Sequence, residues 1–288
     1  MLAACTVSLD RAKRGKEITM QFGMPTLIEI KSLESCVSLC RELGLAFVEL
    51  NMNMQEYQAH RLDLERLRRI ADDNGIYYTI HLDENLNPCD FNERVASAYT
   101  NTVLHIIETA KQLAMPVLVM HMNSGVRVTL PDEKVFLFSE YESDYLRKLT
   151  AFRDACEIAI GESDIKICVE NCGDFGDRPF IRNGLELLLE SPVFALTFDI
   201  GHNAGADYVD EPFIMEHADR LAHFHIHDAR GHNNHLALGE GDVDMGRYLD
   251  LAEMRSINSS TGCRAVVEVK TVDGLRRSVS FLKDRRLI

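Results

Sequence analysis

The strongest constraint on the fold of this chain is an alternation of short apolar runs with longer amphipathic stretches, repeated eight times. The short runs are rich in β-branched residues, as buried strands are, and the stretches between them space apolar residues as one face of a helix does. Strands that alternate with helices pair in parallel through right-handed crossovers. The expected strands are residues 18–23, 46–51, 76–82, 116–122, 165–170, 194–199, 221–227 and 264–269.

Eight strand–helix units without a linker between them fit a closed barrel better than an open, doubly wound sheet. An open sheet usually carries a glycine-rich phosphate loop after its first strand, and Phe22-Gly23-Met24-Pro25 is not such a loop. The length of 288 residues is also typical of one barrel domain. The sequence therefore predicts an α/β protein with a single (βα)8 TIM barrel over residues 17–288, preceded by an N-terminal extension of residues 1–16.

The balance of charges and the apolar pattern exclude several classes of protein. The chain has 31 Lys plus Arg against 45 Asp plus Glu, and its net charge of −14 disfavours broad binding to nucleic acid or anionic membranes. No apolar run approaches the roughly 18 residues of a membrane span. The eight cysteines include no C-x-x-C pair, which is typical of reduced, mostly buried thiols. We therefore expect a cytoplasmic protein without a membrane span and without a nucleic-acid partner.

Residue types that bind metals lie at the ends of seven successive expected strands. In a barrel the carboxyl ends of all strands meet at one face, where barrel enzymes have their active sites. Random polar placement would scatter Lys, Arg, Ser and Thr among these positions, so the pattern indicates a site rather than solvated strand ends. The residues are Glu49, His81, His121, Glu170, Asp199, His225 with His227, and Glu268.

The mixture of carboxylates and imidazoles in this set indicates a divalent metal ion. Carboxylates that converge without a cation repel one another, and this raises their pKa values. A divalent cation removes the repulsion, and mixed carboxylate and imidazole ligands suit Mn²⁺, Zn²⁺, Co²⁺ or Fe²⁺ better than Ca²⁺. No cysteine lies among the carboxylates, which argues against a thiolate structural zinc site. We therefore expect a divalent metal ion (Mn²⁺, Zn²⁺ or Co²⁺) at the mouth of the barrel.

Four motifs in the second half of the chain identify a family. They are Val169-Glu170-Asn171, Phe198-Asp199-Ile200-Gly201-His202, His225-Ile226-His227-Asp228 and Asn234-His235-Leu236-Ala237-Leu238-Gly239-Glu240-Gly241-Asp242-Val243-Asp244. They resemble the xylose isomerase-like TIM-barrel superfamily, and the resemblance runs from about Ile18 to the C-terminus. That superfamily contains sugar-phosphate isomerases and epimerases, and also the endonuclease IV group (AP endonuclease family 2). The motifs are specific for the superfamily and do not select a member.

The resemblance implies roles for several residues of the set and for residues near them. The metal shared by the family falls on Glu170, Asp199, His225 and Glu268. In the epimerases two glutamate ligands also exchange the substrate proton, and these fall on Glu170 and Glu268. Five further residues fall on positions that hold additional zinc ions in the nuclease group, and here they are candidates for metal or substrate binding. They are His81, His121, His202, Asn233 and His235.

Two departures from the nuclease pattern bear on the choice between these groups. Asn233 stands where the nucleases have an aspartate, so a third cation site would lack a negative charge. The segment Leu82-Asp83-Glu84 replaces an aromatic residue after the third strand, and the acidic Glu84 would repel a DNA phosphate.

The function that we expect is a divalent-metal-dependent isomerase or epimerase of a small-molecule sugar or sugar phosphate, acting by proton transfer next to a metal-chelated carbonyl. The alternative is an endonuclease IV-like zinc phosphodiesterase acting on abasic DNA, favoured by the presence of both His81 and His121. A lyase, dehydratase or glycoside-processing enzyme on the same scaffold, or a non-catalytic binding protein, are further alternatives. A homodimer is the expected assembly.

Overall fold

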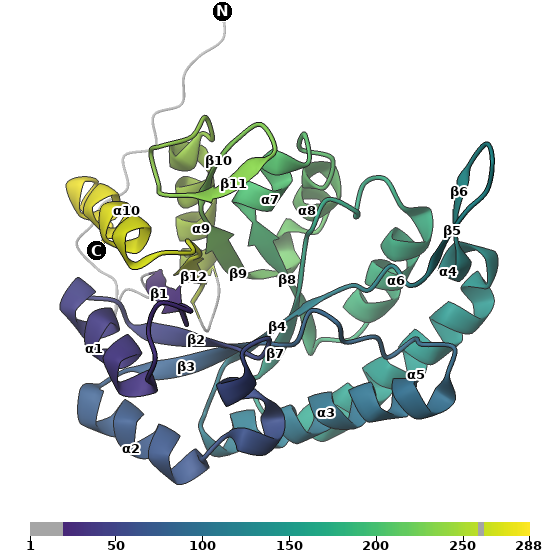
Figure 1. Cartoon of the computed structure of the whole chain (residues 1–288), viewed down its shortest axis with the longest axis horizontal. Coiled ribbons are helices and arrows are strands. Elements are labelled where there is room, and N and C mark those ends of the chain that lie inside the picture. Colours follow the sequence, from purple (N-terminus) through teal and green to yellow (C-terminus); the bar gives the residue numbers. More distant parts are fainter. Residues whose placement is uncertain (1–19, 259–261) are drawn as a thin grey trace, which may run out of the picture.

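The computed structural model describes residues 20–258 and 262–288, and the expected extension of residues 1–16 lies outside the described residues. In the described part of the chain, eight parallel strands form a closed barrel with helices around it (Figure 1). Pairing of the first strand with the last closes the barrel, and this confirms the predicted (βα)8 fold. The barrel strands are β1 (Gln21–Pro25), β2 (Phe47–Asn51), β3 (Tyr77–His81), β4 (Val117–His121), β7 (Lys166–Glu170), β8 (Phe194–Asp199), β9 (Leu221–Ile226) and β12 (Arg264–Val267).

Each predicted strand overlaps one strand of the barrel, and the predicted and observed carboxyl ends differ by at most two residues. The differences arise because hydrogen-bonded pairing, and not the apolar run, determines where a strand ends. At β1, pairing with β2 extends to Pro25 opposite Glu49, two residues beyond the predicted end. The first two residues of that predicted strand, 18 and 19, lie outside the described residues.

The helices follow the strands along the chain and cover the outside of the barrel. Several begin at a side-chain cap: Ser32, Asp63 and Thr271 each accept a hydrogen bond from a backbone N–H of the first turn. The helices are α1 (Leu33–Leu43), α2 (Leu64–Asn74), α3 (Glu93–Gln112), α4 (Leu137–Glu140), α5 (Glu142–Ile160), α6 (Pro179–Leu189), α7 (Ile200–Gly205), α8 (Glu211–Glu216), α9 (Met245–Asn258) and α10 (Val272–Asp284), with short 3-10 turns η1 (Gln55–Tyr57), η2 (Ala59–Arg61) and η3 (Ala218–Arg220).

Two hairpins interrupt the alternation of strands and helices. The first, β5 (Arg127–Thr129) with β6 (Lys134–Phe136), projects away from the barrel at the right of Figure 1. The second, β10 (Asp228–Arg230) with β11 (Asn233–Leu236), directly follows β9 and packs against α7. This second hairpin places β11 beside the carboxyl ends of the barrel strands, where His235 of β11 contacts the backbone of Glu268.

The interior of the barrel changes from apolar to polar along the strands. Side chains at alternate positions of a barrel strand point inward. An apolar cluster of Val117, Val119, Cys168 and Ala195 fills part of the interior. Further toward the carboxyl ends, the inward positions carry carboxylates, imidazoles and threonines. A polar face is thereby built on top of a packed barrel.

The cysteines and the helices of the described residues bear on the oxidation state of the thiols and on membrane spans. The seven cysteines within the described residues are free thiols, and six of the seven are buried, as expected. None of the helices in residues 20–258 and 262–288 combines the length and apolar character that crossing a bilayer requires.

Candidate metal centre

Four strand ends bring together the side chains expected to hold a metal. Glu170 ends β7, Asp199 ends β8, His225 lies near the end of β9, and Glu268 directly follows β12. Asp199 pairs with His225 in the barrel register, so their side chains stand at the same height. One donor atom from each of the four residues lies within 4.8 Å of the other three. We call these four residues the carboxylate group.

The spacing of the carboxylate group fits one divalent ion. Nδ1 of His225 lies 3.3 Å from Oε2 of Glu170, 3.1 Å from Oε2 of Glu268 and 3.8 Å from Oδ2 of Asp199. Ligands that share a zinc-type ion at about 2.0–2.2 Å lie roughly 3–3.5 Å from one another. Within the described residues, neither Nδ1 of His225 nor Oε2 of Glu268 has a hydrogen-bond partner, although both are buried. Buried polar atoms that converge without partners are the donors that a cation would satisfy.

The electrostatics of the carboxylate group also favour a cation. Burial alone would raise the pKa of Glu170, but His225 and His121 beside it hold that pKa well below its usual range. Burial alone would lower the pKa of His225, but Glu170 and Glu49 raise it well above its usual value. The buried carboxylates therefore require positive charge nearby. A metal ion would supply that charge and displace protons from the imidazoles.

His81 and His121 form a second donor group around Glu170. Their Nε2 atoms lie 3.3 Å and 3.2 Å from Oε2 of Glu170. Nδ1 of His81 is 2.8 Å from the carbonyl oxygen of Leu82, which can only accept, so Nδ1 carries a proton. Burial opposes a charge on His81, but Glu170 raises its pKa to about 9. Nε2 of His81 therefore faces the carboxylate either as the N–H of an imidazolium or as a ligand to a cation.

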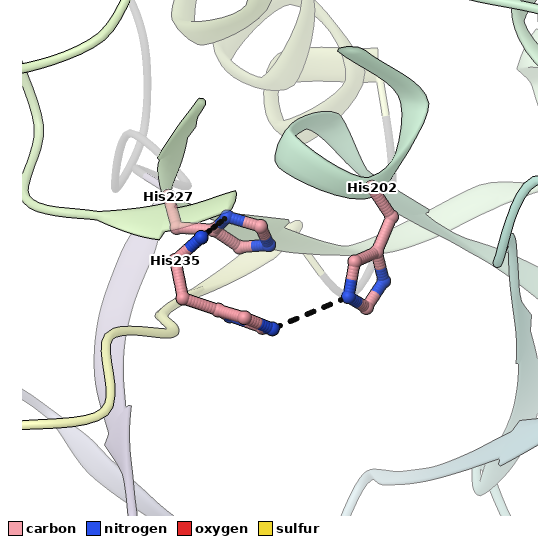
Figure 2. Close-up of side chains that lie close together, drawn as sticks. All are labelled: His202, His227 and His235. Atoms are coloured by element: carbon pink, nitrogen blue, oxygen red, sulfur yellow. Dashed lines mark hydrogen bonds between the residues drawn. The ribbon is translucent and has the colours of Figure 1, made fainter. Parts of the chain in front are cut away.

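His202, His227 and His235 form a third cluster, which we call the histidine group (Figure 2). His202 lies in the first turn of α7, His227 joins β9 to β10, and His235 lies on β11. Nε2 of His202 is 3.3 Å from Nε2 of His235. Nδ1 of His235 is 3.0 Å from the carbonyl oxygen of Glu268, so it holds a proton and leaves Nε2 with a lone pair.

His227 connects the histidine group to the carboxylate group. The backbone N–H of His235 donates to Nδ1 of His227 over 2.8 Å, as Figure 2 shows. Nδ1 therefore has no proton, and Nε2 must donate to Asp199, whose Oδ2 lies 3.1 Å away. His227 is fully buried, and a Cβ on Gly201 would lie 2.0 Å from its ring, so only glycine fits there. This arrangement makes His227 a residue that orients the Asp199 carboxylate.

The structure places one residue of the expected site differently. Asn233, expected beside His202 and His235, lies opposite Arg230 on β11 with an exposed side chain. The buried side chain beside those two histidines is His227 instead. The reason lies in the hairpin backbone: His235 has a left-handed φ of 56°, which breaks the alternation of β11. Asn233 and His235 therefore do not share a face.

Sequence reasoning assigned no role to three residues that contact the carboxylate group. Glu49 lies beneath His225, and Lys270 donates to Oε1 of Glu268 over 2.9 Å. His227 is two residues beyond His225. Glu49 and His227 belong to the strand-end set predicted from the sequence, although neither was given a role, whereas Lys270 was not predicted.

Comparison with known proteins identifies the family. The family model described as a xylose isomerase-like TIM barrel matches residues 37–285 of this chain. The chain therefore belongs to the xylose isomerase-like TIM-barrel family, as its motifs predicted.

Individual relatives match this chain over most of their own length. An uncharacterised protein of Methanocaldococcus jannaschii is 28% identical over 247 residues, which cover 81% of this chain and 79% of that protein. A D-tagatose 3-epimerase-like protein of known structure is 25% identical, with a TM-score of 0.71 over 92% of this chain and 96% of that one. The IOLI protein, solved with a zinc atom, is 14% identical, with a TM-score of 0.66 over 93% of this chain and 97% of its own. At that identity the last likeness concerns the fold alone.

Proposed function

We propose that this protein is a divalent-metal-dependent isomerase or epimerase of a small-molecule sugar or sugar phosphate. The observation that carries the proposal is the position of Glu170 and Glu268, which reach one cluster of donors from β7 and β12. Two strands, β8 and β9, separate β7 from β12 in the barrel, so the two carboxylates approach from different sides. Membership of the family and the likeness to a D-tagatose 3-epimerase-like protein support the same class of reaction.

The carboxylate group would hold the cation, for which Mn²⁺, Zn²⁺ and Co²⁺ suit the donor set. When bound, such an ion polarises a substrate carbonyl and the adjacent hydroxyl, which makes the C–H bond between them acidic. The zinc in the IOLI protein is consistent with an ion of this type in the fold.

The residues of the chain would then move the proton. Glu170 would remove the proton from one face of the substrate carbon, and Glu268 would return it to the other face in an epimerase. His202 and His235, whose Nε2 atoms lie together at the edge of the cluster, would bind substrate hydroxyls. His81 and His121 would bind a further substrate oxygen beside Glu170.

One observation favours a second candidate, an endonuclease IV-like zinc phosphodiesterase acting on abasic DNA. Donor groups flank the carboxylate group on two sides, one at His81 and His121 and the other at His202 and His235. Additional ions held there would activate water for attack on a phosphate. The net charge of −14 and the acidic Glu84 argue against a DNA substrate.

The test is deuterium incorporation, followed by NMR, with a panel of ketoses, free and phosphorylated, in deuterated water. The metal-loaded enzyme should exchange the substrate C–H in at least one sugar, because proton transfer passes through a carboxylate that also exchanges with solvent. A phosphodiesterase touches no C–H bond. Absence of exchange with every sugar, together with metal-dependent cleavage of a duplex with an abasic site, would replace this proposal with the second candidate.

A further inference from the structure

Beneath the carboxylate group lies a sealed polar layer that the proposed reaction does not use. It consists of Glu49 on β2, Thr79 on β3 and His223 on β9, and these residues are at most 1% exposed. The hydroxyl of Thr79 donates to Oε2 of Glu49 over 2.9 Å, and Nε2 of His223 donates to the same oxygen over 3.1 Å. A carboxylate so deep in a barrel is costly to bury, and packing alone does not require one.

The other oxygen of this carboxylate faces the candidate metal centre. Oε1 of Glu49 lies 2.8 Å from Nε2 of His225, a contact at ion-pair distance. Nδ1 of the same ring faces Glu170 and Glu268 in the carboxylate group. The imidazole of His225 therefore stands between the buried Glu49 carboxylate and the proposed ligands of the cation.

The contact with Glu49 decides which nitrogen of His225 carries a proton. A neutral imidazole has one N–H and one lone pair. A lone pair on Nε2 would lie only 2.8 Å from a negatively charged oxygen, closer than any carboxylate oxygen near Nδ1, so charge repulsion favours the proton on Nε2. The lone pair then lies on Nδ1, the atom that faces the other donors. A carboxylate behind a ligating histidine also makes that histidine a more basic ligand.

We propose that Glu49 is a positioning residue for the metal centre, which holds His225 with its proton on Nε2 and so presents Nδ1 to the cation. Thr79 and His223 take Oε2 of Glu49 and leave Oε1 for His225. The inference rests on the metal centre of the proposed function and is independent of which substrate that centre serves. This role accounts for a carboxylate in so deeply buried a layer.

The test compares Glu49→Gln with Thr79→Val, measured by chelator competition with Zn²⁺ alone and without substrate. Glu49→Gln keeps the size of the side chain and removes its charge, and it should weaken zinc binding by about 10–100-fold, the usual effect of losing such a partner. Thr79→Val removes a hydrogen bond from the same carboxylate and keeps the charge, so zinc affinity should stay within about threefold of wild type. Glu49→Asp keeps the charge further from the ring and should fall between them.

A spectroscopic measurement separates positioning from a merely structural role. In the Co²⁺-loaded protein, the exchangeable Nε2 proton of His225 should give a shifted resonance in water that moves in Glu49→Gln and stays in Thr79→Val. Thermal melting of the metal-free proteins measures how much each substitution costs the fold. Should Glu49→Gln fail to fold, Glu49→Asp and Thr79→Val supply the same comparison.

The outcomes distinguish this inference from the proposed function. Tight zinc binding by wild type and equal binding by Glu49→Gln would overturn the role of Glu49 and leave the metal centre in place. Equal losses in Glu49→Gln and Thr79→Val would show that the layer acts through packing, and would also overturn it. No zinc binding by wild type would overturn both proposals. Zinc binding without sugar turnover would affect only the proposed function.

Discussion

The carboxylate group and the histidine group lie side by side, yet the fold builds them in different ways. Strand ends and the residue after β12 supply the whole carboxylate group, so the barrel itself fixes its geometry. The histidine group depends on α7, on the β9–β10 junction and on β11. Its position is set by a hairpin, and among its links to the carboxylate group are the hydrogen bond from His227 to Asp199 and the contact of His235 with the carbonyl oxygen of Glu268.

The two groups also differ in charge. Burial opposes a charge on His202, but Asp199 and Glu170 outweigh it and raise the pKa to about 10. Burial lowers the pKa of His235 to about 4. At neutral pH His235 thus keeps a lone pair on Nε2, which accepts the proton of His202. The carboxylate group requires a cation, whereas the histidine group offers both a donor and an acceptor to a substrate hydroxyl.

This difference predicts opposite effects of truncation on metal content. Asp199→Ala or His225→Ala should strip a tightly bound divalent ion from the purified protein and abolish turnover, because each removes a donor at the centre of the cluster. His235→Ala should retain that ion, since its Nε2 faces His202 rather than the carboxylates. Elemental analysis of the three variants checks this. Retention of metal in both Asp199→Ala and His225→Ala would refute the ligand assignment.

The two glutamates test what the carboxylate group does beyond holding a cation. Glu170→Gln and Glu268→Gln each keep an oxygen ligand and lose the base, so turnover should drop by about 10²–10⁴-fold. Each variant should keep slow deuterium exchange on the face of the substrate carbon that the remaining glutamate serves. The two variants should therefore differ in which epimer of the sugar loses exchange. His235→Ala is the comparison variant. It should change the KM for the sugar more than it changes the rate of deuterium exchange. Equal exchange in wild type and both glutamine variants would exclude these residues as the bases.

The sequence predicts the carboxylate group well for a physical reason. A strand end in a closed barrel has one possible location, so residue type and strand order suffice to bring Glu170, Asp199 and His225 together. The histidine group is harder to predict because β11 folds back by an antiparallel hairpin with a left-handed residue at His235. No periodicity in the sequence predicts this hairpin or the left-handed backbone at His235. Asn233 was therefore expected where His227 lies.

Replacement of His227 measures how strongly the two groups are connected. His227→Ala removes the hydrogen bond to Oδ2 of Asp199, and zinc affinity should fall by roughly tenfold, the lower end of the range for residues that orient a ligand. His232→Ala is the matched control, because His232 belongs to the same hairpin and its Nδ1 donates to the carbonyl of Gly205. Zinc affinities by chelator competition check this. Equal affinities in the two variants would mean that Asp199 needs no orienting partner.

A substitution at Gly201 tests the same connection through packing, without a change in any polar side chain. A Cβ on Gly201 would lie 2.0 Å from the His227 ring, so Gly201→Ala should displace the ring and destabilise the protein by about 1–3 kcal/mol. In a His227→Ala background the ring is gone. There alanine should instead stabilise the start of α7 by roughly 0.4–1 kcal/mol, because it restricts the unfolded chain more than glycine does. Urea denaturation of the four metal-free proteins gives the double-mutant cycle. A reversal of sign would show that glycine is required at 201 only to accommodate His227. The same cost in both backgrounds would place the requirement in the backbone of α7 and remove this link between the two groups.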